Sequence, residues 1–143
     1  MSERFSSLMA RATLLVHQGE FSAALDYLNQ AVAATREEIA DLEKRLEDQR
    51  FEDAVDVDRR LAEKRLAEAL ELRRDVFRKL DRRLEAERDL HEAVIIRLKI
   101  MRRRCAGLNQ AHNYQEAEGL YREALETCRR HFGDRHRETA TCL

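Results

Sequence analysis

Apolar residues recur every three or four positions over residues 51–109, which is the spacing of the buried stripe of an α-helix. No proline interrupts this span, and its single glycine comes late. From residue 66 onward the apolar residues follow the a and d positions of a heptad: Leu66, Leu70, Phe77, Leu80, Leu84, Val94, Leu98, Met101, Cys105 and Leu108. We predict a long central helical segment over residues 51–110, as one helix or two nearly collinear helices. A continuous helix would reach about 85–90 Å at 1.5 Å per residue, which predicts an elongated molecule.

Polar residues interrupt the heptad series at Arg73, Glu87 and His91. A helix packed against other helices of its own chain tolerates such gaps, because its buried face can shift along its length. A long two-stranded coiled coil tolerates them less well. Two interpretations therefore stay open, in which the coiled-coil-like central segment either packs within its own chain or joins two chains in a homodimer.

The first 48 residues carry the pattern of two amphipathic helices. Apolar residues in the segment 4–17 fall on one helical face. Gly19 follows, and glycine ends helices because it adopts the left-handed conformation at little steric cost. A second helical pattern begins near Phe21 and continues to about residue 48. We predict a helical hairpin over residues 4–48.

The same arrangement of small and large residues returns near the C-terminus. Five residues of the first pattern match five of the second at the same internal spacing: Gly19, Phe21, Ala24, Leu28 and Ala31 match His112, Tyr114, Ala117, Tyr121 and Ala124. Alanine at the crossing points lets two helices approach closely. The match predicts an internal repeat, with a second hairpin over residues 98–133.

This pattern, Gly-x-Phe-x-x-Ala-x-x-x-Leu-x-x-Ala, resembles the second half of a tetratricopeptide repeat. The C-terminal copy is the more specific one, because residues 131–140 also resemble the turn between kinesin light chain-type repeats. The resemblance covers the N-terminal hairpin and the C-terminal segment only. It implies an all-α fold of tetratricopeptide-like hairpins around the long charged central helix, in a single domain over residues 1–143. Residues 136–143 then resemble the start of a further repeat helix.

The centre of the chain lies outside this resemblance. A weaker echo of the repeat begins at Phe51 and Ala54 but continues with Asp58, where an apolar residue should pack. The central helices are therefore either overgrown repeat helices or an inserted coiled coil.

Composition excludes some classes of partner. Charged residues make up 38% of the chain, yet the formal net charge is −1, which argues against a general electrostatic attraction to nucleic acid or to an anionic membrane. No apolar run is long enough for a membrane span. The three cysteines are odd in number and lie in helical sequence, which favours a reducing compartment. We expect a cytoplasmic protein without a membrane partner.

Nothing in the sequence carries a pattern of catalytic residues. The four glycines form no phosphate-binding loop, and no nucleophile stands in a recognisable elbow. The spacing of Cys128, His131, His136 and Cys142 partly resembles that of zinc ligands, but His136 is already accounted for by the repeat-turn pattern. We expect no catalytic residue, no cofactor and no bound metal.

The strongest local feature is the basic stretch at residues 97–104. On a helix, Leu98, Met101 and Cys105 form the packed stripe, which leaves four polar residues on an adjoining face: Lys99, Arg102, Arg103 and Asn109. In repeats of the resembled family the leading helix lines a groove that holds extended peptides. The resemblance therefore implies that these residues bind an acidic peptide or a C-terminal carboxylate. The alternative is a solvated basic turn that is balanced by Glu85, Glu87 and Glu92.

These observations predict a non-enzymatic protein–protein interaction or scaffold module. The resemblance points toward an adaptor in motor, cytoskeletal or ciliary assemblies. One alternative is a coiled-coil homodimerisation module that is capped by the hairpins. Another is an arginine-rich helical protein associated with nucleic acid, although basic residues interleaved with aromatic ones are absent from the sequence.

Overall fold

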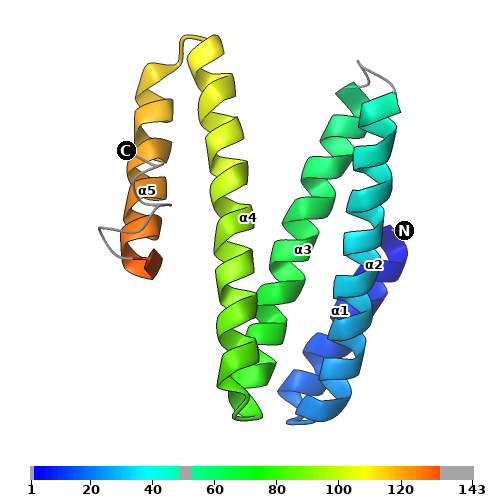
Figure 1. The fold of residues 1–143 in the computed structure, drawn as a ribbon. Coiled ribbons are helices and arrows are strands. Elements are labelled where there is room, and N and C mark those ends of the chain that lie inside the picture. The colour runs from blue at the N-terminus through cyan, green and yellow to red at the C-terminus, as the bar shows by residue number, and fades with distance from the viewer. Residues whose placement is uncertain (1, 49–52, 133–143) are drawn as a thin grey trace. The chain divides into compact units, whose positions relative to one another are not determined.

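The computed structural model describes residues 2–48 and 53–132, which form five α-helices (Figure 1): α1 (Ser2–His17), α2 (Phe21–Asp48), α3 (Asp53–Lys79), α4 (Arg83–Gln110) and α5 (Tyr114–Phe132). No strand occurs among the described residues, and the predicted all-α fold is confirmed. The predicted hairpin over residues 4–48 falls on α1 and α2. The predicted hairpin over residues 98–133 falls on the later part of α4 and on α5. The predicted helix start at residues 136–143 lies outside the described residues.

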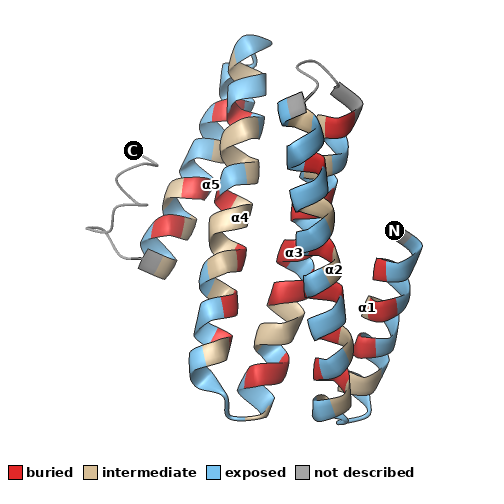
Figure 2. Cartoon of the chain, turned by 45° about the vertical axis from the view of Figure 1, so that its right-hand side comes forward, coloured by how far each residue is buried: buried red, intermediate tan, exposed pale blue. Residues whose placement is uncertain are grey.

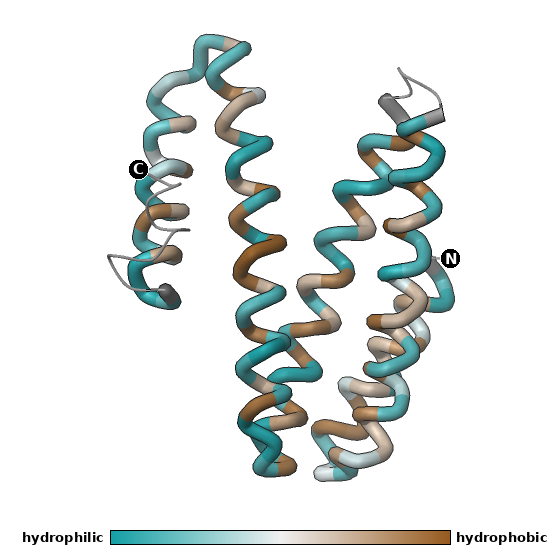
Figure 3. Tube along the Cα trace, viewed as in Figure 1, coloured by the Kyte–Doolittle hydropathy of each residue, from teal (hydrophilic) through white to brown (hydrophobic). Residues whose placement is uncertain are grey.

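Contacts divide the chain into two compact units. The first unit comprises residues 1–93 and the second residues 94–143, so the boundary falls within α4. Each unit buries apolar stripes of its own helices, as Figures 2 and 3 show by burial and by hydropathy. The organisation of residues 1–143 as a single domain and the elongated shape stay predictions.

Three helices end in the same turn. The backbone of one residue in each turn is left-handed, with φ of 77° at Gly19, 59° at Asp81 and 59° at His112. The next residue in each turn donates its N–H to the carbonyl five positions earlier: Glu20 to Leu15 at 2.9 Å, Arg82 to Phe77 at 2.8 Å, and Asn113 to Leu108 at 2.8 Å. In each turn the left-handed residue also donates its N–H to the carbonyl three positions earlier, at 3.1 Å, which completes the Schellman motif. The motif satisfies carbonyls at the end of the helix and reverses the chain.

The helix after each turn repeats one arrangement of small residues. Alanine stands five positions after each left-handed residue, at Ala24, Ala86 and Ala117, and again twelve positions after it, at Ala31, Ala93 and Ala124. All six alanines are buried. Among the described residues this turn with its two alanines therefore occurs three times, and the sequence pattern did not predict the occurrence at Asp81.

The central segment differs from its prediction. Residues 51–110 hold α3 and α4 in place of one helix or two collinear ones, and the chain turns back at Asp81 (Figure 1). Arg73 and Asp89 would lie about 24 Å apart along a continuous helix. Instead, their side chains are joined at 2.7 Å. The prediction of a continuous or collinear central helix is therefore wrong.

The core of the first unit explains why the heptad pattern was misleading. The end of α3 packs on the start of α2, and buried residues from four helices form one cluster: Ala12, Ala24, Leu25, Leu28, Val76, Phe77 and Ala86. Leu66 and Leu70, which would form the seam of a dimer, are also buried. The apolar stripe of α3 is thus used within the chain.

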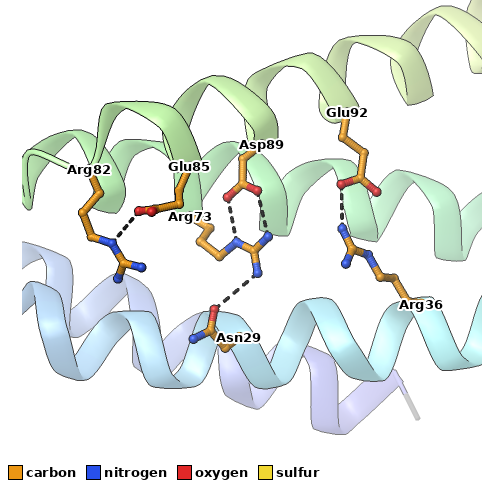
Figure 4. A network of polar contacts seen from close by, with 7 residues as sticks. All are labelled: Asn29, Arg36, Arg73, Arg82, Glu85, Asp89 and Glu92. Carbon is orange, nitrogen blue, oxygen red and sulfur yellow. Dashed lines mark hydrogen bonds and ion pairs between the residues drawn. The ribbon is translucent and has the colours of Figure 1, made fainter.

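A polar network ties the helices of the first unit together (Figure 4). Arg73 pairs with Asp89 across α3 and α4, and it also donates a hydrogen bond of 3.3 Å to the side chain of Asn29 on α2. Arg36 on α2 pairs with Glu92 on α4 at 2.6 Å. Arg73, which interrupts the heptad series, therefore forms a buried ion pair. Its contacts link three helices.

Candidate protein-binding site

The second unit contains a helical hairpin built from residues 94–110 of α4 and from α5. Its core consists of Leu98, Ala124 and Cys128, with Val94 and Met101 packed against them. Near the turn, the buried thiol of Cys105 donates a hydrogen bond of 3.8 Å to the carbonyl oxygen of Ala117. The close approach at Ala117 fixes the two helices against each other and positions the side chains along their edge.

An open hollow of about 380 Å³ lies along that edge. Its lining comes from α4 and α5: Asn109, Tyr114, Ala117, Glu118, Tyr121, Arg122 and Leu125. Tyr114 is 59% exposed and Tyr121 is 42% exposed, so both rings present apolar surface to the solvent. Together with the half-buried Leu125 they form an aromatic surface, which we call the tyrosine face.

Hydrogen bonds hold both tyrosines in place. The side-chain amide of Asn109 donates to the hydroxyl of Tyr121 at 3.2 Å. The ring nitrogen Nδ1 of His112 and the hydroxyl of Tyr114 lie 2.8 Å apart, and the two rings meet edge to face. The tyrosine face is therefore preorganised, which lowers the entropy that a partner would have to overcome on binding.

The same hairpin carries an excess of positive charge on α4. Residues 94–110 include five basic residues and no acidic one: Arg97, Lys99, Arg102, Arg103 and Arg104. Arg104 lies 3.9 Å from Glu116 of α5, where both side chains are largely exposed. Two of the three carboxylates named in the sequence analysis pair with residues outside this stretch, Glu85 with Arg82 and Glu92 with Arg36.

The predicted site residues do not share one face of α4. Asn109 lines the hollow, and Arg102 lies on the same side two turns earlier. Lys99 and Arg103 lie one turn apart, on a side of the helix turned away from Cys105 and therefore away from α5. Lys99 is exposed, whereas Arg102, Arg103 and Asn109 are half-buried. Binding of a peptide by these four residues stays a prediction.

Tyr114 and Tyr121 are not among the predicted site residues, because both occupy positions of the repeat that are expected to pack. A signal was present in the residue types. The first hairpin has Phe21 and Leu28 at the matching positions, and replacing them by tyrosine adds hydroxyl groups that need polar partners.

Cys105, one of the two buried cysteines of the hairpin, does not resemble an activated nucleophile. Burial raises the pKa of the Cys105 thiol above its ordinary value of 9.0, and the positive charge of Arg104 opposes this only in part. Since the thiolate is the reactive form, the thiol is less reactive than an exposed one. No group of three His, Cys, Asp or Glu side chains that could hold a metal ion occurs in the part of the chain that the structure describes. His136 and Cys142, two of the four residues with zinc-like spacing, lie outside that part.

None of the helices formed by residues 2–48 and 53–132 is both long enough and apolar enough to cross a membrane.

Comparison with known protein families identifies part of this hairpin. Residues 108–138 match the model of the tetratricopeptide repeat family, a span that begins at the end of α4 and includes the turn and α5. No curated protein and no solved structure matches the chain. The tetratricopeptide repeat is a protein–protein interaction fold. The resemblance inferred from residues 112–124 is therefore confirmed, and residues 108–138 form a segment of the tetratricopeptide repeat type.

Proposed function

We propose that this chain is a non-enzymatic protein–protein interaction module that binds an acidic partner segment through the hairpin of α4 and α5. The observation that carries the proposal is the coincidence of two features in one hairpin. Residues 108–138 match an interaction repeat, and the preceding helix carries five basic residues without an acidic one from residue 94 to residue 110. Opposite charge at that surface attracts the partner and orients it on approach.

The residues that we expect to meet the partner are Lys99, Arg102, Arg103 and Asn109. Guanidinium groups bind carboxylates through paired hydrogen bonds, and an amide such as that of Asn109 can bind a peptide backbone. The partner chemistry that fits is an acidic peptide or a free C-terminal carboxylate. Because Lys99 and Arg103 lie on a different side of α4 from Asn109, an extended peptide would have to wrap around the helix to meet all four.

Binding to short peptides rich in Asp and Glu tests this proposal. Each peptide is labelled with a fluorophore and titrated with the full chain, once with a free C-terminal carboxylate and once amidated. The variant Lys99→Glu with Arg103→Glu should lose at least about tenfold in affinity. The matched control Lys44→Glu with Lys64→Glu makes the same change of charge at exposed positions on α2 and α3, and it should bind nearly as the parent chain does.

The outcomes of this experiment separate cleanly. A loss confined to the Lys99 and Arg103 variant supports the proposal, and a further loss on amidation assigns the C-terminal carboxylate as the ligand. Equal binding by both variants, or no binding even at low salt where charge attraction is strongest, overturns it.

We further propose an adaptor role in cytoplasmic motor, cytoskeletal or ciliary assemblies. Only the resemblance of residues 131–140 to kinesin light chain-type repeats supports this step, and a fold by itself does not determine a function. Localisation of the tagged full chain in cells tests it. Enrichment on microtubules or cilia is the expected result, and a diffuse signal that is independent of both would overturn it.

A further inference from the structure

The tyrosine face of α5 has a counterpart on α2. Counting from the left-handed residue of each turn, four residues of α5 match four of α2: Tyr114, Glu118, Tyr121 and Leu125 match Phe21, Leu25, Leu28 and Val32. The two turns have the same hydrogen bonds, and the two helices bury alanine at the same positions. The matched residues therefore project from equivalent places on their helices.

On α2 this face is covered by another helix. Leu25 and Leu28 belong to one buried cluster with Val76 and Phe77 of α3, and Leu28 is completely buried. Leu72 of α3 and Leu80, which directly follows α3, pack against the same cluster. The last turns of α3 therefore lie over the face of α2 that corresponds to the tyrosine face.

On α5 the tyrosines at the equivalent positions are exposed. Tyr121 is 42% exposed where Leu28 has no exposed surface, and the hollow beside it has a volume of about 380 Å³. Among residues 94–132, no helix of the second unit other than α4 and α5 is present to cover it. Within residues 94–132, the second unit therefore has no counterpart of the helix that covers this face in the first unit.

The residue types on α5 suit a helix that binds reversibly. Phe21, Leu25 and Leu28 are replaced by two tyrosines and by Glu118, which pairs with Arg122 at 2.7 Å. Tyrosine can stay exposed because its hydroxyl is solvated or hydrogen-bonded, yet it buries a large apolar area when a partner binds. Tyrosine is enriched at protein interfaces for this reason.

We propose that the tyrosine face binds an amphipathic helix of a partner protein, in the position that α3 takes on α2. The partner helix should present apolar residues at the spacing of Leu72, Val76, Phe77 and Leu80, with a Lys or Arg near Glu118. This inference deepens the proposed interaction function and rests on it, but it uses residues other than the basic ones. The two can therefore fail separately.

The test uses a peptide of residues 66–80 from this chain as the probe. The peptide carries the apolar residues with which α3 covers α2, and a staple between its exposed positions 68 and 75 keeps it helical. The probe is labelled with a fluorophore and titrated with the full chain. A peptide of the same composition with the apolar stripe scrambled is the control for nonspecific binding.

Three variants locate the binding. Tyr121→Ser should weaken binding of the probe by at least about tenfold, because it removes a central aromatic anchor. Tyr121→Phe keeps the ring and should bind within about twofold of the parent chain. Leu84→Ser removes another exposed apolar side chain, 76% exposed and in the first unit, and should have no effect. Circular dichroism confirms that each variant is folded.

Every outcome is decisive. Saturable binding that is lost in Tyr121→Ser and kept in Tyr121→Phe supports the proposal. Absence of saturable binding overturns it, as does equal binding by all variants, which would mean that the probe exchanges with α3 in the first unit. Nitration of tyrosines in the full chain adds a check. If Tyr114 and Tyr121 are protected without any partner, the face is occupied by the chain itself or by a second copy, and the proposal fails.

Binding of acidic peptides remains a separate result. If Lys99→Glu with Arg103→Glu abolishes acidic peptide binding but leaves the helical probe bound, the two ligands use different surfaces of one hairpin. If the helical probe fails while acidic peptides bind, only the tyrosine face is overturned.

Discussion

Arg73 on α3 and Asp89 on α4 face each other across the first unit and are joined by two hydrogen bonds of 2.7 Å, from Nε and from a terminal nitrogen to the two carboxylate oxygens. Only 15% of the arginine side chain and 4% of the aspartate side chain are exposed. The guanidinium group also lies over the ring of Phe77. It donates a further hydrogen bond to the side chain of Asn29 (Figure 4). The geometry of the pair fixes the register of α3 against α4.

Removing one partner of this pair should destabilise the protein strongly. Asp89→Ala leaves the charge of Arg73 buried without its carboxylate, which is expected to cost about 3 kcal/mol of unfolding free energy. The matched control is Glu92→Ala, because its pair with Arg36 joins two helices at the surface, where the side chains are 40% and 49% exposed. That control should cost no more than about 1 kcal/mol. Urea denaturation of both variants measures the difference, and equal losses would contradict a special role for the buried pair.

The turn between α3 and α4 makes a second prediction. Asp81 holds a left-handed backbone, which strains any residue that has a Cβ atom. Asp81→Gly should therefore raise stability by up to about 1 kcal/mol, and Asp81→Ala should lower it because alanine tolerates this conformation less well than aspartate. The corresponding change Gly19→Ala in the first turn should cost about 1 kcal/mol or more. A thermal melt of each variant checks the signs, and the turn assignment is wrong if Asp81→Gly is destabilising.

Sequence patterns located two of these three turns and missed the one at Asp81. At Gly19 and at His112 the flanking aromatic residue and alanines were all present. At the turn of α3 and α4, Asp81 and Arg83 replace the glycine and the aromatic residue, and only Ala86, Leu90 and Ala93 keep the pattern. The residues that mark a turn in the sequence are therefore missing at this position. The packing of α3 on α2 favours the turn instead.

Heptad periodicity was misleading for a physical reason. A regular apolar stripe shows that one face of a helix is buried, but not which helix covers it. Phe77 and Leu84 occupy matching heptad positions, yet they stand on opposite sides of the turn, and Leu84 is largely exposed. The pattern could not show that Arg73 is paired. A buried ion pair requires a partner from a distant part of the sequence, and heptad spacing does not identify that partner.

A third prediction concerns the solution mass. The apolar stripe that a parallel coiled-coil dimer would need is buried inside the first unit at Leu66, Leu70 and Phe77. Because these residues are already buried within the chain, two chains should not dimerise through them. Light scattering should therefore give a mass near 16.8 kDa at micromolar concentration. A stable species of twice that mass would revive the homodimer alternative.

The fourth prediction concerns the buried thiol of Cys105. Because burial raises its pKa above 9.0, the folded chain keeps the thiol proton at a pH where the unfolded chain has lost it. This contribution to stability is therefore fully present below pH 9.0 and is lost as the pH rises through the pKa of the folded state. Urea titrations between pH 8 and pH 10 should show stability falling in the parent chain and falling less in Cys105→Ala. The same slope in both proteins would contradict this assignment.

Only part of the candidate site could be predicted from the sequence. A cluster such as residues 97–104 is a local property, and it could be found without a structure. The sides of α4 on which Lys99 and Asn109 lie depend on where α5 packs. The exposure of Tyr114 and Tyr121 depends on the absence of a covering helix in the described residues of the second unit. Repeat patterns predict buried positions, so they do not reveal that these two tyrosines are exposed.

Photocrosslinking from position 121 is the most direct measurement of whether the hairpin of α4 and α5 binds protein. A benzoylphenylalanine replaces Tyr121 in the full chain, and a second chain carries it at the exposed Leu84 as a control. Irradiation in a cell lysate should yield a discrete protein adduct at position 121 that is absent at position 84 and is suppressed by excess stapled peptide of residues 66–80. The absence of any adduct specific to position 121, or adducts that are identical at both positions, would contradict a binding role for the tyrosine face.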